Sequence, residues 1–321
     1  VAVFNLGSLG EYINPAGAAA LAVNSQATAT VVDSLIANNW GANDVPAVTV
    51  AGSLTLINTT VTGEARQGAS GFGIKIESYN AVLVLRQSTI TQFRIGLRSD
   101  LGIDDVTIEN SILSGNGEWD CLGSVTNGFT PTWSGHNVVG KHQACAVPAG
   151  QVFNDGAELH ALKANGGPTA THAIGPDSPA YGVGVNCNPD HDQRGAPRPT
   201  DCSAGAYEPV VAAEQAVTGD LRPGGFITYT FTIAPRGATV LTPTTLTDTL
   251  PVPLVAVPGS ASASAGAAAL TGNTLTWTGA ADPATPPVVS VQAQIDPAGP
   301  RPIINNVADV TWQGFSGPSS A

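Results

Sequence analysis

Carboxylates in the first half of the chain are the side chains best suited to acid–base chemistry. Asp104, Asp105 and Glu109 lie close together, and Glu118 and Asp120 follow them. Hydrolysis of a glycosidic bond needs two carboxyl groups about 5 to 10 Å apart. Neighbouring strand residues point to opposite faces, so Asp104 and Asp105 would not share a site within a strand. A solvated turn is therefore the preferred interpretation, and a catalytic pair is the alternative.

A lyase would instead combine acidic calcium ligands with a base that removes a proton. Lys75, Arg94 and Arg98 are available for the second role, but their spacing does not distinguish them from surface charges. Oxygen-bearing side chains gather in Asn188-Pro189-Asp190-His191-Asp192, and Ca²⁺ prefers carboxylate and carbonyl oxygens. Asp190 and Asp192 are thus candidate calcium ligands, with a solvated turn as the default interpretation. No other cofactor is expected.

Histidine and cysteine spacing favours structure over chemistry. The histidines form no His-x-His or His-x-x-x-His pair, so we expect no zinc site; they are His136, His142, His160, His172 and His191. Ser134-Gly135-His136 lacks the flanks of a nucleophile elbow. The four cysteines fit two disulfides, and we favour the local connectivity over the other pairings and over free thiols. That connectivity joins Cys121 to Cys145 and Cys187 to Cys202.

Composition excludes several partners. The chain of 321 residues has only 12 Lys and Arg and a net charge of −12, so we expect neither nucleic acid nor an anionic membrane surface to bind it. No apolar run approaches the ~18 residues that a membrane-spanning helix needs, so no membrane insertion is expected in this segment. Because Val1 starts within a strand-like pattern, we also expect sequence to be missing before Val1 or after Ala321.

A repeat runs through the first third of the chain. Each copy has a polar residue, then Ser or Thr, and an aliphatic residue two places later. The aliphatic positions are 25, 29 and 23 residues apart, and they are Ile36, Val61, Ile90 and Leu113. A variable period of about 20 to 30 residues is typical of a solenoid. Stacked coils would place these aliphatic side chains in one core.

Polar residues of the same repeat suggest a second stack. Asn58, Gln87 and Asn110 take equivalent positions, where their amides could form a ladder along the solenoid. Asn58-Thr59-Thr60 is also a glycosylation sequon, but we assign it to the ladder. The sequence thus predicts an all-β fold that begins with a right-handed parallel β-helix.

The composition changes near residue 210, and we divide the chain into domains 1–209 and 210–321. Within 121–209 the repeat gives way to loops, which we interpret as a disulfide-pinned cap that covers the exposed end of the β-helix. Arg194 and Arg198 could hold this cap by pairing with acids; the candidates are Asp192, Asp201 and Glu208. From 210 onward, short alternating strands such as Phe226–Ile233 predict a C-terminal Ig-like β-sandwich.

Motifs in both domains resemble known families. Residues 121–209 resemble the end of the β-helix in bacterial choice-of-anchor Q domain proteins, through Asn165-Gly166-Gly167-Pro168-Thr169, Thr171-His172-Ala173, Ser178-Pro179-Ala180, Asp192-Gln193-Arg194-Gly195, Arg198-Pro199 and Cys202 leading into Gly205-Ala206-Tyr207-Glu208. Tyr181-Gly182-Val183-Gly184 departs from that family, which usually has Ile-Asp-Ala-Gly there. The resemblance implies export and attachment to the cell surface, and no known reaction.

Residues 210–321 resemble the conserved repeat domain of unknown function that occurs on prokaryotic surface proteins. The shared motifs are Pro223-Gly224 before Ile227-Thr228-Tyr229-Thr230, Thr247-Asp248-Thr249-Leu250-Pro251, Leu275-Thr276-Trp277 and Asn305-Asn306-Val307-Ala308. Some surface sandwiches carry Lys–Asn crosslinks. No Lys follows Lys163, so such a crosslink cannot form within this domain.

The sequence leaves three candidate functions open. The first is a non-catalytic, secreted surface protein, such as a stalk, a sheath or a subunit of an extracellular filament that joins copies of itself. The second is an adhesin or carbohydrate-binding module that binds surface glycans by stacking sugars on Trp40, Trp119 or Trp133. The third is a polysaccharide lyase or hydrolase. We favour the first and expect no enzyme.

Overall fold

The computed structural model describes residues 2–4, 8–9, 19–37, 45–63, 71–102, 105–237, 239–300 and 303–319. The chain forms two compact units. Unit 1 comprises residues 1–174 and 178–208, and unit 2 comprises residues 175–177 and 209–321. Asp104 and Trp40 lie outside the described residues. Within these ranges, no helix is long and apolar enough to cross a membrane.

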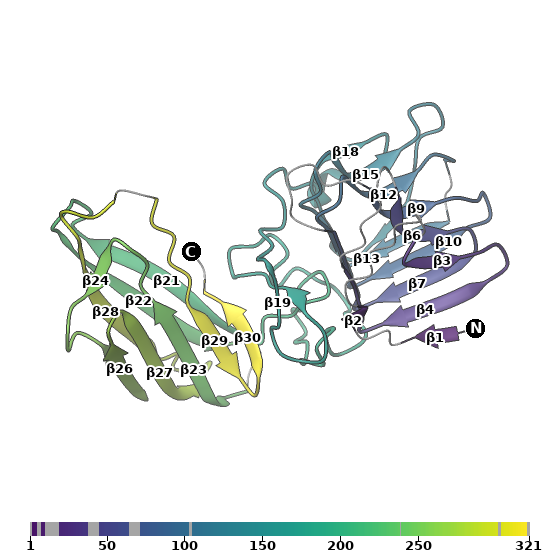
Figure 1. Cartoon of the computed structure of the whole chain (residues 1–321). Helices are drawn as coiled ribbons and strands as arrows, with labels where there is room; N and C mark the ends of the chain where they lie inside the picture. The colour runs from purple at the N-terminus through teal and green to yellow at the C-terminus, as the bar shows by residue number, and fades with distance from the viewer. Residues whose placement is uncertain are drawn as a thin grey trace. The chain divides into compact units, whose positions relative to one another are not determined.

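Unit 1 is a parallel β-helix made of three sheets, each with six strands in the described residues. Successive strands of the chain go to different sheets in turn, so every sheet gains one strand per coil. Figure 1 shows β4, β7 and β10 stacked in this order. The first sheet holds β1 (Ala2–Phe4), β4 (Thr28–Val32), β7 (Ser53–Ile57), β10 (Val82–Arg86), β13 (Val106–Glu109) and β16 (Thr132–Ser134).

The other two sheets of unit 1 follow the same order. The second holds β2 (Ser8–Leu9), β5 (Leu35–Ala37), β8 (Thr60–Thr62), β11 (Thr89–Thr91), β14 (Ile112–Leu113) and β17 (Val138–Val139). The third holds β3 (Leu21–Val23), β6 (Pro46–Val50), β9 (Phe72–Ile76), β12 (Ile95–Ser99), β15 (Trp119–Gly123) and β18 (His142–Gln143).

The aliphatic stack predicted from the repeat is confirmed. Register pairs Ile36 with Val61, Val61 with Ile90 and Ile90 with Leu113, and all four side chains are fully buried. Strand alternation turns every second side chain inward, so parallel rows from the other sheets join the same core. One such row runs through Val48, Ile74, Leu97 and Cys121.

The polar ladder runs one position later than the repeat suggested. The backbone N–H of Thr59 donates to Ser88 Oγ (3.3 Å), and that of Ser88 donates to Ser111 Oγ (3.1 Å). These short hydroxyls are buried at the corner between the first and second sheets. The amide residues Asn58, Gln87 and Asn110 do occupy equivalent positions, each with positive φ. Their side chains bind elsewhere, as described below.

The segment 157–208, called the flank segment here, is the later part of the predicted cap 121–209. It lies against the outer face of the second sheet. Ile112 of β14 and Val138 of β17 pack there against Ala173, Ile174, Ala180, Ala204 and Tyr207. Its described regular structure is limited to β19 (Leu162–Lys163) and β20 (Thr171–His172). The outward apolar side chains of the coils explain this position, because they would otherwise meet water.

The residues just before the flank segment contact the last coil. Val152 bridges β17 at Val139, and Phe153 N–H donates to the Val139 carbonyl (2.8 Å). The short 3₁₀ turn η1 (Ala149–Gln151) precedes this contact. Residues 152–153, which also belong to the predicted cap 121–209, therefore pair with the last strand of the second sheet.

Unit 2 consists of two antiparallel sheets that pack face to face, since β22 contacts β27 and β21 contacts β29. One sheet holds β21 (Val211–Gly219), β22 (Phe226–Pro235), β28 (Val288–Ile295), β24 (Leu254–Ala256) and β25 (Ser262–Ala263). The other holds β26 (Ala267–Thr271), β27 (Thr274–Ala281), β23 (Leu241–Thr249), β29 (Asp309–Trp312) and β30 (Phe315–Pro318). Alternate side chains face inward, and the largest is the fully buried Trp277.

Candidate functional site

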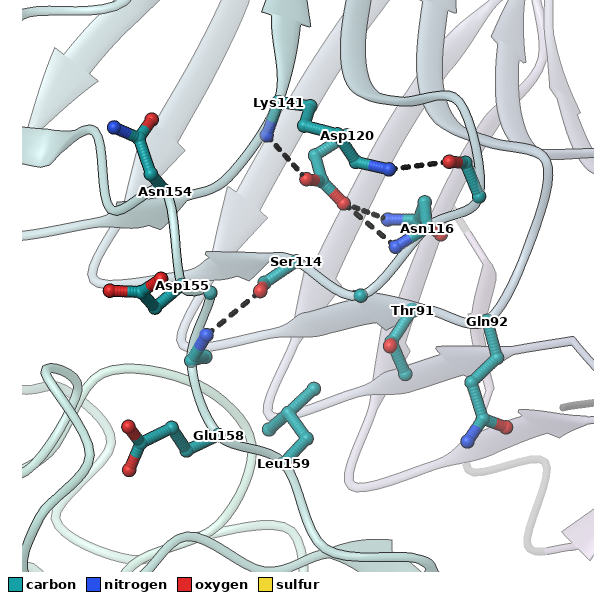
Figure 2. A pocket seen from close by; sticks show the side chains of 14 residues that line it. Thr91, Gln92, Ser114, Asn116, Asp120, Lys141, Asn154, Asp155, Glu158 and Leu159 are labelled. Atoms are coloured by element: carbon teal, nitrogen blue, oxygen red, sulfur yellow. Dashed lines mark hydrogen bonds between the residues drawn. The ribbon is translucent and has the colours of Figure 1, made fainter.

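A polar pocket opens at the corner of unit 1 where the second sheet turns into the third. Its volume is about 470 Å³, within the ~300–1,000 Å³ of typical ligand pockets. The coils contribute residues 91–92, 114–117 and 120, and the opposite wall comes from residues 154–159 (Figure 2). Among the described residues, no aromatic side chain lines it. Hydroxyl, amide and carboxyl groups share the lining with apolar atoms such as those of Leu159, so it suits a ligand with several polar groups.

Asp120 lies at the back of this pocket and is almost fully buried. Its Oδ1 accepts hydrogen bonds from the backbone N–H (2.9 Å) and the side-chain amide (2.7 Å) of Asn116. Its Oδ2 accepts the backbone N–H of Lys141 (2.7 Å), as Figure 2 shows. Burial raises the pKa of the Asp120 carboxyl, although these hydrogen bonds act in the opposite direction.

This arrangement makes Asp120 a positioning residue for two turns of neighbouring coils. Its carboxylate has three donors around it, and Gly140 is so close that a Cβ there would lie 2.4 Å from Oδ2. The Lys141 ammonium donates to the Gly117 carbonyl, a second link between the same two turns. Both groups therefore connect the turns that line the pocket.

The pocket rim carries exposed polar groups from the opposite wall. Asn154, Asp155 and Glu158 are all exposed there. Ser114 Oγ accepts the Ala157 N–H (2.8 Å), which fixes this wall to β14's coil. The repeat does not point to these residues, because the wall at 154–159 follows the last repeat copy. A rim of carboxylates and amides can hydrogen-bond the hydroxyls of a sugar or the amino group of an amine.

The described members of the acidic set predicted for catalysis do not come together; Asp104 lies outside the described residues. Glu109 pairs with Arg86 (2.9 Å) and Glu118 with Arg94 (3.1 Å), in each case with the neighbouring coil. Asp105 is exposed just before β13, where its carbonyl accepts the Leu83 N–H. Among the described members of that set, Asp105, Glu109 and Glu118 do not line the pocket with Asp120. The other described carboxylates in its lining are those of Asp155 and Glu158.

The basic residues considered for a lyase also have acidic neighbours. Lys75 lies 3.2 Å from Glu77, and Arg98 lies 3.0 Å from Asp100. Arg94 and Arg98 both cover the ring of Phe72 on the outside of the third sheet, with guanidinium carbons 5.1 and 4.7 Å from its centroid. These contacts are typical of an ion-paired, partly exposed surface.

The candidate calcium ligands are far from equivalent. The Asp190 side chain is 98% exposed, whereas that of Asp192 is 0% exposed. Asp192 Oδ1 accepts the N–H groups of Arg194 (2.8 Å) and Ala196 (3.0 Å), and Oδ2 accepts Arg194 Nε (2.8 Å) and Glu208 N–H (2.8 Å). Four donors occupy the carboxylate, so this geometry does not favour calcium. Within the described residues, no group of three or more His, Cys, Asp or Glu could hold a metal ion.

The histidines mostly join separate parts of unit 1. His172 is buried, with Nδ1 2.8 Å from the His160 carbonyl and Nε2 3.0 Å from Thr62 Oγ1. Burial lowers the pKa of the His172 imidazole, so the neutral ring is favoured. His142 Nδ1 lies 3.2 Å from the Cys145 carbonyl, and the His136 ring lies against Phe153.

Both predicted disulfides are confirmed. Cys121 is linked to Cys145, and Cys187 is linked to Cys202. The first joins β15 to the loop that follows β18, inside the main core. The second lies within the flank segment. Each bond thus closes a local loop of unit 1, and the described residues include no free cysteine.

The flank segment contains a cluster of buried charges, the clasp, made of Asp192, Arg194, Arg198 and Glu208. Arg194 pairs with Asp192 at 2.8 Å and Arg198 with Glu208 at 2.9 Å, and all four side chains are at most 1% exposed. The pairing expected for Arg194 and Arg198 is thus found, while Asp201 is exposed. Arg198 also donates to the Gly205 carbonyl (2.7 Å).

The clasp extends to the amide residues of the coils. Asn58 Nδ2 donates to the His191 carbonyl (2.8 Å), and Asn110 Nδ2 donates to the Val185 carbonyl (2.8 Å). Once its amide is oriented correctly, Gln87 donates to the Asn188 carbonyl (2.7 Å) and accepts from Arg198 Nε (3.1 Å). The side-chain amides of Asn58, Gln87 and Asn110, predicted to bind one another, therefore mainly bind the flank segment. Each comes from a different coil.

Of the tryptophans proposed as sugar platforms, two are described. Trp133 is partly buried against the main core, and its Nε1 donates to the Ala146 carbonyl (2.7 Å). Trp119 is partly buried at the start of β15. Neither lines the pocket.

No protein-family model and no curated protein matches the chain. The family resemblances noted from the motifs therefore stay predictions.

Proposed function

We propose that the chain is a non-catalytic structural module of an extracellular stalk, sheath or filament. The observation that carries this proposal is the clasp: its four charged side chains bind one another and, through Arg198, the amides of the coils. Breaking a buried pair is costly, so such a network fixes one geometry. Three of the acids considered for chemistry on the coils have such partners: Glu109 and Glu118 form ion pairs, and Asp120 accepts hydrogen bonds.

The extracellular location is supported by the two disulfides, because such bonds persist in oxidising compartments. Both lie in unit 1 and add constraints to the segments that pack around the coils. A surface location and assembly with copies of the same chain remain part of the proposal.

Electron microscopy of the native material, together with light scattering of the purified chain in native salt, tests this proposal. We expect ordered polymers or a continuous layer that contains the chain. Monomers alone, in both measurements, would overturn it. Turnover of uronic acid polymers, with or without calcium, would also overturn it if Asp120→Asn and Glu109→Gln abolished the activity without unfolding the chain.

Glycan binding is the second candidate, and the corner pocket is the observation that favours it. The hydroxyl, amide and carboxyl groups of its lining match sugar hydroxyl groups, although no described aromatic side chain offers the usual stacking surface. A glycan array tests this candidate. Binding should weaken in Glu158→Gln and Asp155→Asn, while Asp190→Asn, which alters an exposed acid outside the pocket, should bind normally.

A further inference from the structure

Strand β26 forms one rim of unit 2 (Figure 1). It is the terminal strand of its sheet and pairs, within the described residues, only with β27. The pairing runs from Ala267 with Thr278 to Thr271 with Thr274 without a bulge. Its outer edge is therefore a straight row of backbone groups available to another strand.

The turn after β26 determines which groups face outward. Gly272 and Asn273 form a two-residue connection, with Gly272 at φ +59°. In such a hairpin the flanking residues Thr271 and Thr274 exchange backbone hydrogen bonds, and the pattern then alternates. Ala269 thus bonds to β27, while Ala268 and Leu270 direct their N–H and C=O groups to the open edge.

This rim lacks the protection that sheet edges usually have. Residues 249–281 contain no Asp, Glu, Lys, Arg or His, so no charge lies on β24, β25, β26 or β27. Other edge strands of unit 2 differ: β30 ends in Pro318, β21 carries Glu214, and β24 and β25 are short and separated by Pro258. Charges, prolines and short length all discourage pairing with another strand, and β26 has neither a charge nor a proline.

We propose that β26 pairs in antiparallel fashion with β26 of a second copy of this chain. Two chains of net charge −12 repel each other, so they can approach most easily through uncharged surfaces. The side chains along β26 are small, with Ala267, Ala269 and Thr271 exposed. A strand of the same sequence therefore meets neither bulk nor like charge.

The outward groups limit the possible registers, and the one that overlaps both five-residue strands completely is centred on Ala269. Ala268 of one copy would exchange backbone hydrogen bonds with Leu270 of the other, and the reverse pair would form as well. Ala269 then lies opposite its own copy, at a position without backbone hydrogen bonds, where side chains approach most closely. The two sheets join into one continuous sheet about a two-fold axis.

This inference goes beyond the proposed structural role. A two-fold contact closes on itself and gives a dimer, so a polymer requires a second, different contact. Polymers without this dimer would overturn the inference alone. Dimers without any polymer would overturn the proposed function alone.

Sedimentation velocity of the full chain over a wide concentration range tests the pairing. We expect a monomer–dimer equilibrium that Ala269→Lys shifts towards monomer, raising the dissociation constant on the order of tenfold or more, because equal charges would face each other. Thr247→Lys is the matched control, since Thr247 is exposed on the same sheet face and lies two strands away. It should dimerise like the wild type.

Two further variants test the register directly. Ala269→Cys should form an intermolecular disulfide on mild oxidation, while Thr247→Cys should not. Ala268→Pro removes an outward N–H, which an edge strand tolerates, and should abolish dimers while unit 2 keeps its melting temperature. A wild-type chain that stays monomeric at the highest concentration would overturn the proposal. So would a dimer that Ala269→Lys leaves intact, or Ala269→Cys that crosslinks no better than Thr247→Cys.

Discussion

Unit 1 and unit 2 differ in how they treat buried charge. The buried ionic groups of unit 1 all have hydrogen-bond or ion-pair partners, and they are Asp120, His172, Asp192, Arg194, Arg198 and Glu208. Unit 2 buries Asp248, whose Oδ2 accepts from Asn306 Nδ2 (3.1 Å) but whose Oδ1 has no partner among the described residues. Unit 1 uses buried charges to bind its segments together, whereas unit 2 buries the Asp248 carboxyl at a cost in folding free energy.

The architecture explains this difference. Each coil of a β-helix contacts only its neighbours, so a lateral face stays open unless another segment covers it. The flank segment covers such a face with little regular structure of its own, and side-chain bonds must therefore hold it. The two sheets of unit 2 cover each other through alternating apolar side chains, so no such network is needed.

The largest effect that tests this comparison is expected for Arg198→Met. Glu208 would lose its buried cationic partner while staying 0% exposed, which costs about 3–5 kcal/mol in comparable cases. Urea unfolding of the full chain should show a weakened transition of unit 1 and an unchanged transition of unit 2.

Arg86→Met is the matched control, because Arg86 and Glu109 form a pair on a partly exposed surface (35% and 20%) worth at most about 1 kcal/mol. Arg198→Met combined with Glu208→Gln should recover part of the loss, since the uncompensated charge is then gone. Equal losses in Arg198→Met and Arg86→Met would show that the clasp does not stabilise unit 1.

A slightly smaller effect is expected when Cys187 and Cys202 are both changed to Ala. Their bond closes a loop of 15 residues, which corresponds to about 3 kcal/mol of chain entropy. Calorimetry should show a lower melting temperature for unit 1 only. If unit 2 melted earlier to the same extent, the two units would not be independent in the way the comparison assumes.

The repeat predicted the core of unit 1 because one aliphatic position per coil, such as Ile90, determines the stack. It failed for the ladder because side-chain length decides which polar residue faces the corner. Ser88 Oγ is short enough to reach the neighbouring coil from inside, whereas the longer amide of Gln87 extends outward to the flank segment. Gln87 and Ser88 are adjacent in the repeat, and the period alone does not tell which of the two faces the neighbouring coil.

The ion pairs of the coils could have been predicted. Arg86 and Glu109 are 23 residues apart and Arg94 and Glu118 are 24 apart, close to the 23-residue spacing of Ile90 and Leu113. Opposite charges one coil apart lie side by side in a solenoid. The corner pocket could not be predicted in this way, because the wall near Asp155 comes from chain beyond the last repeat copy.

In unit 2, Asp248→Asn should stabilise the sandwich at neutral pH by a few degrees in melting temperature. Burial raises the pKa of Asp248 above its ordinary value of 3.8, so its favourable contribution is complete below that value and is lost as pH rises through the raised pKa. The amide removes the buried charge and keeps an oxygen for Asn306.

Thermal unfolding of unit 2 across pH measures this effect. The gain of Asp248→Asn over the wild type should vanish towards acid, where the wild-type carboxyl is protonated. Asp309→Asn, at an exposed position of β29, is the control for a change of net charge. A gain of the same size at every pH would contradict burial of a charge as the cause.

The smallest effect concerns pH and the contact between His172 and the coils. Burial lowers the pKa of His172 from its ordinary value of 6.5, so its contribution to stability is complete above that value and decreases as pH falls, because the unfolded chain takes up the proton first. Protonation would also place an N–H against the Thr62 hydroxyl that donates to Nε2 in the neutral form.

Hydrogen exchange of the flank segment between about pH 7.5 and pH 5 should therefore show faster opening at the lower pH, after correction for intrinsic rates. His172→Gln should remove this pH dependence, while His136→Gln should leave it, since the His136 ring is half-buried and contacts Phe153. If both variants kept the pH dependence, another group would control the docking of the flank segment. If exchange in unit 2 followed the same profile, the effect would not belong to this contact.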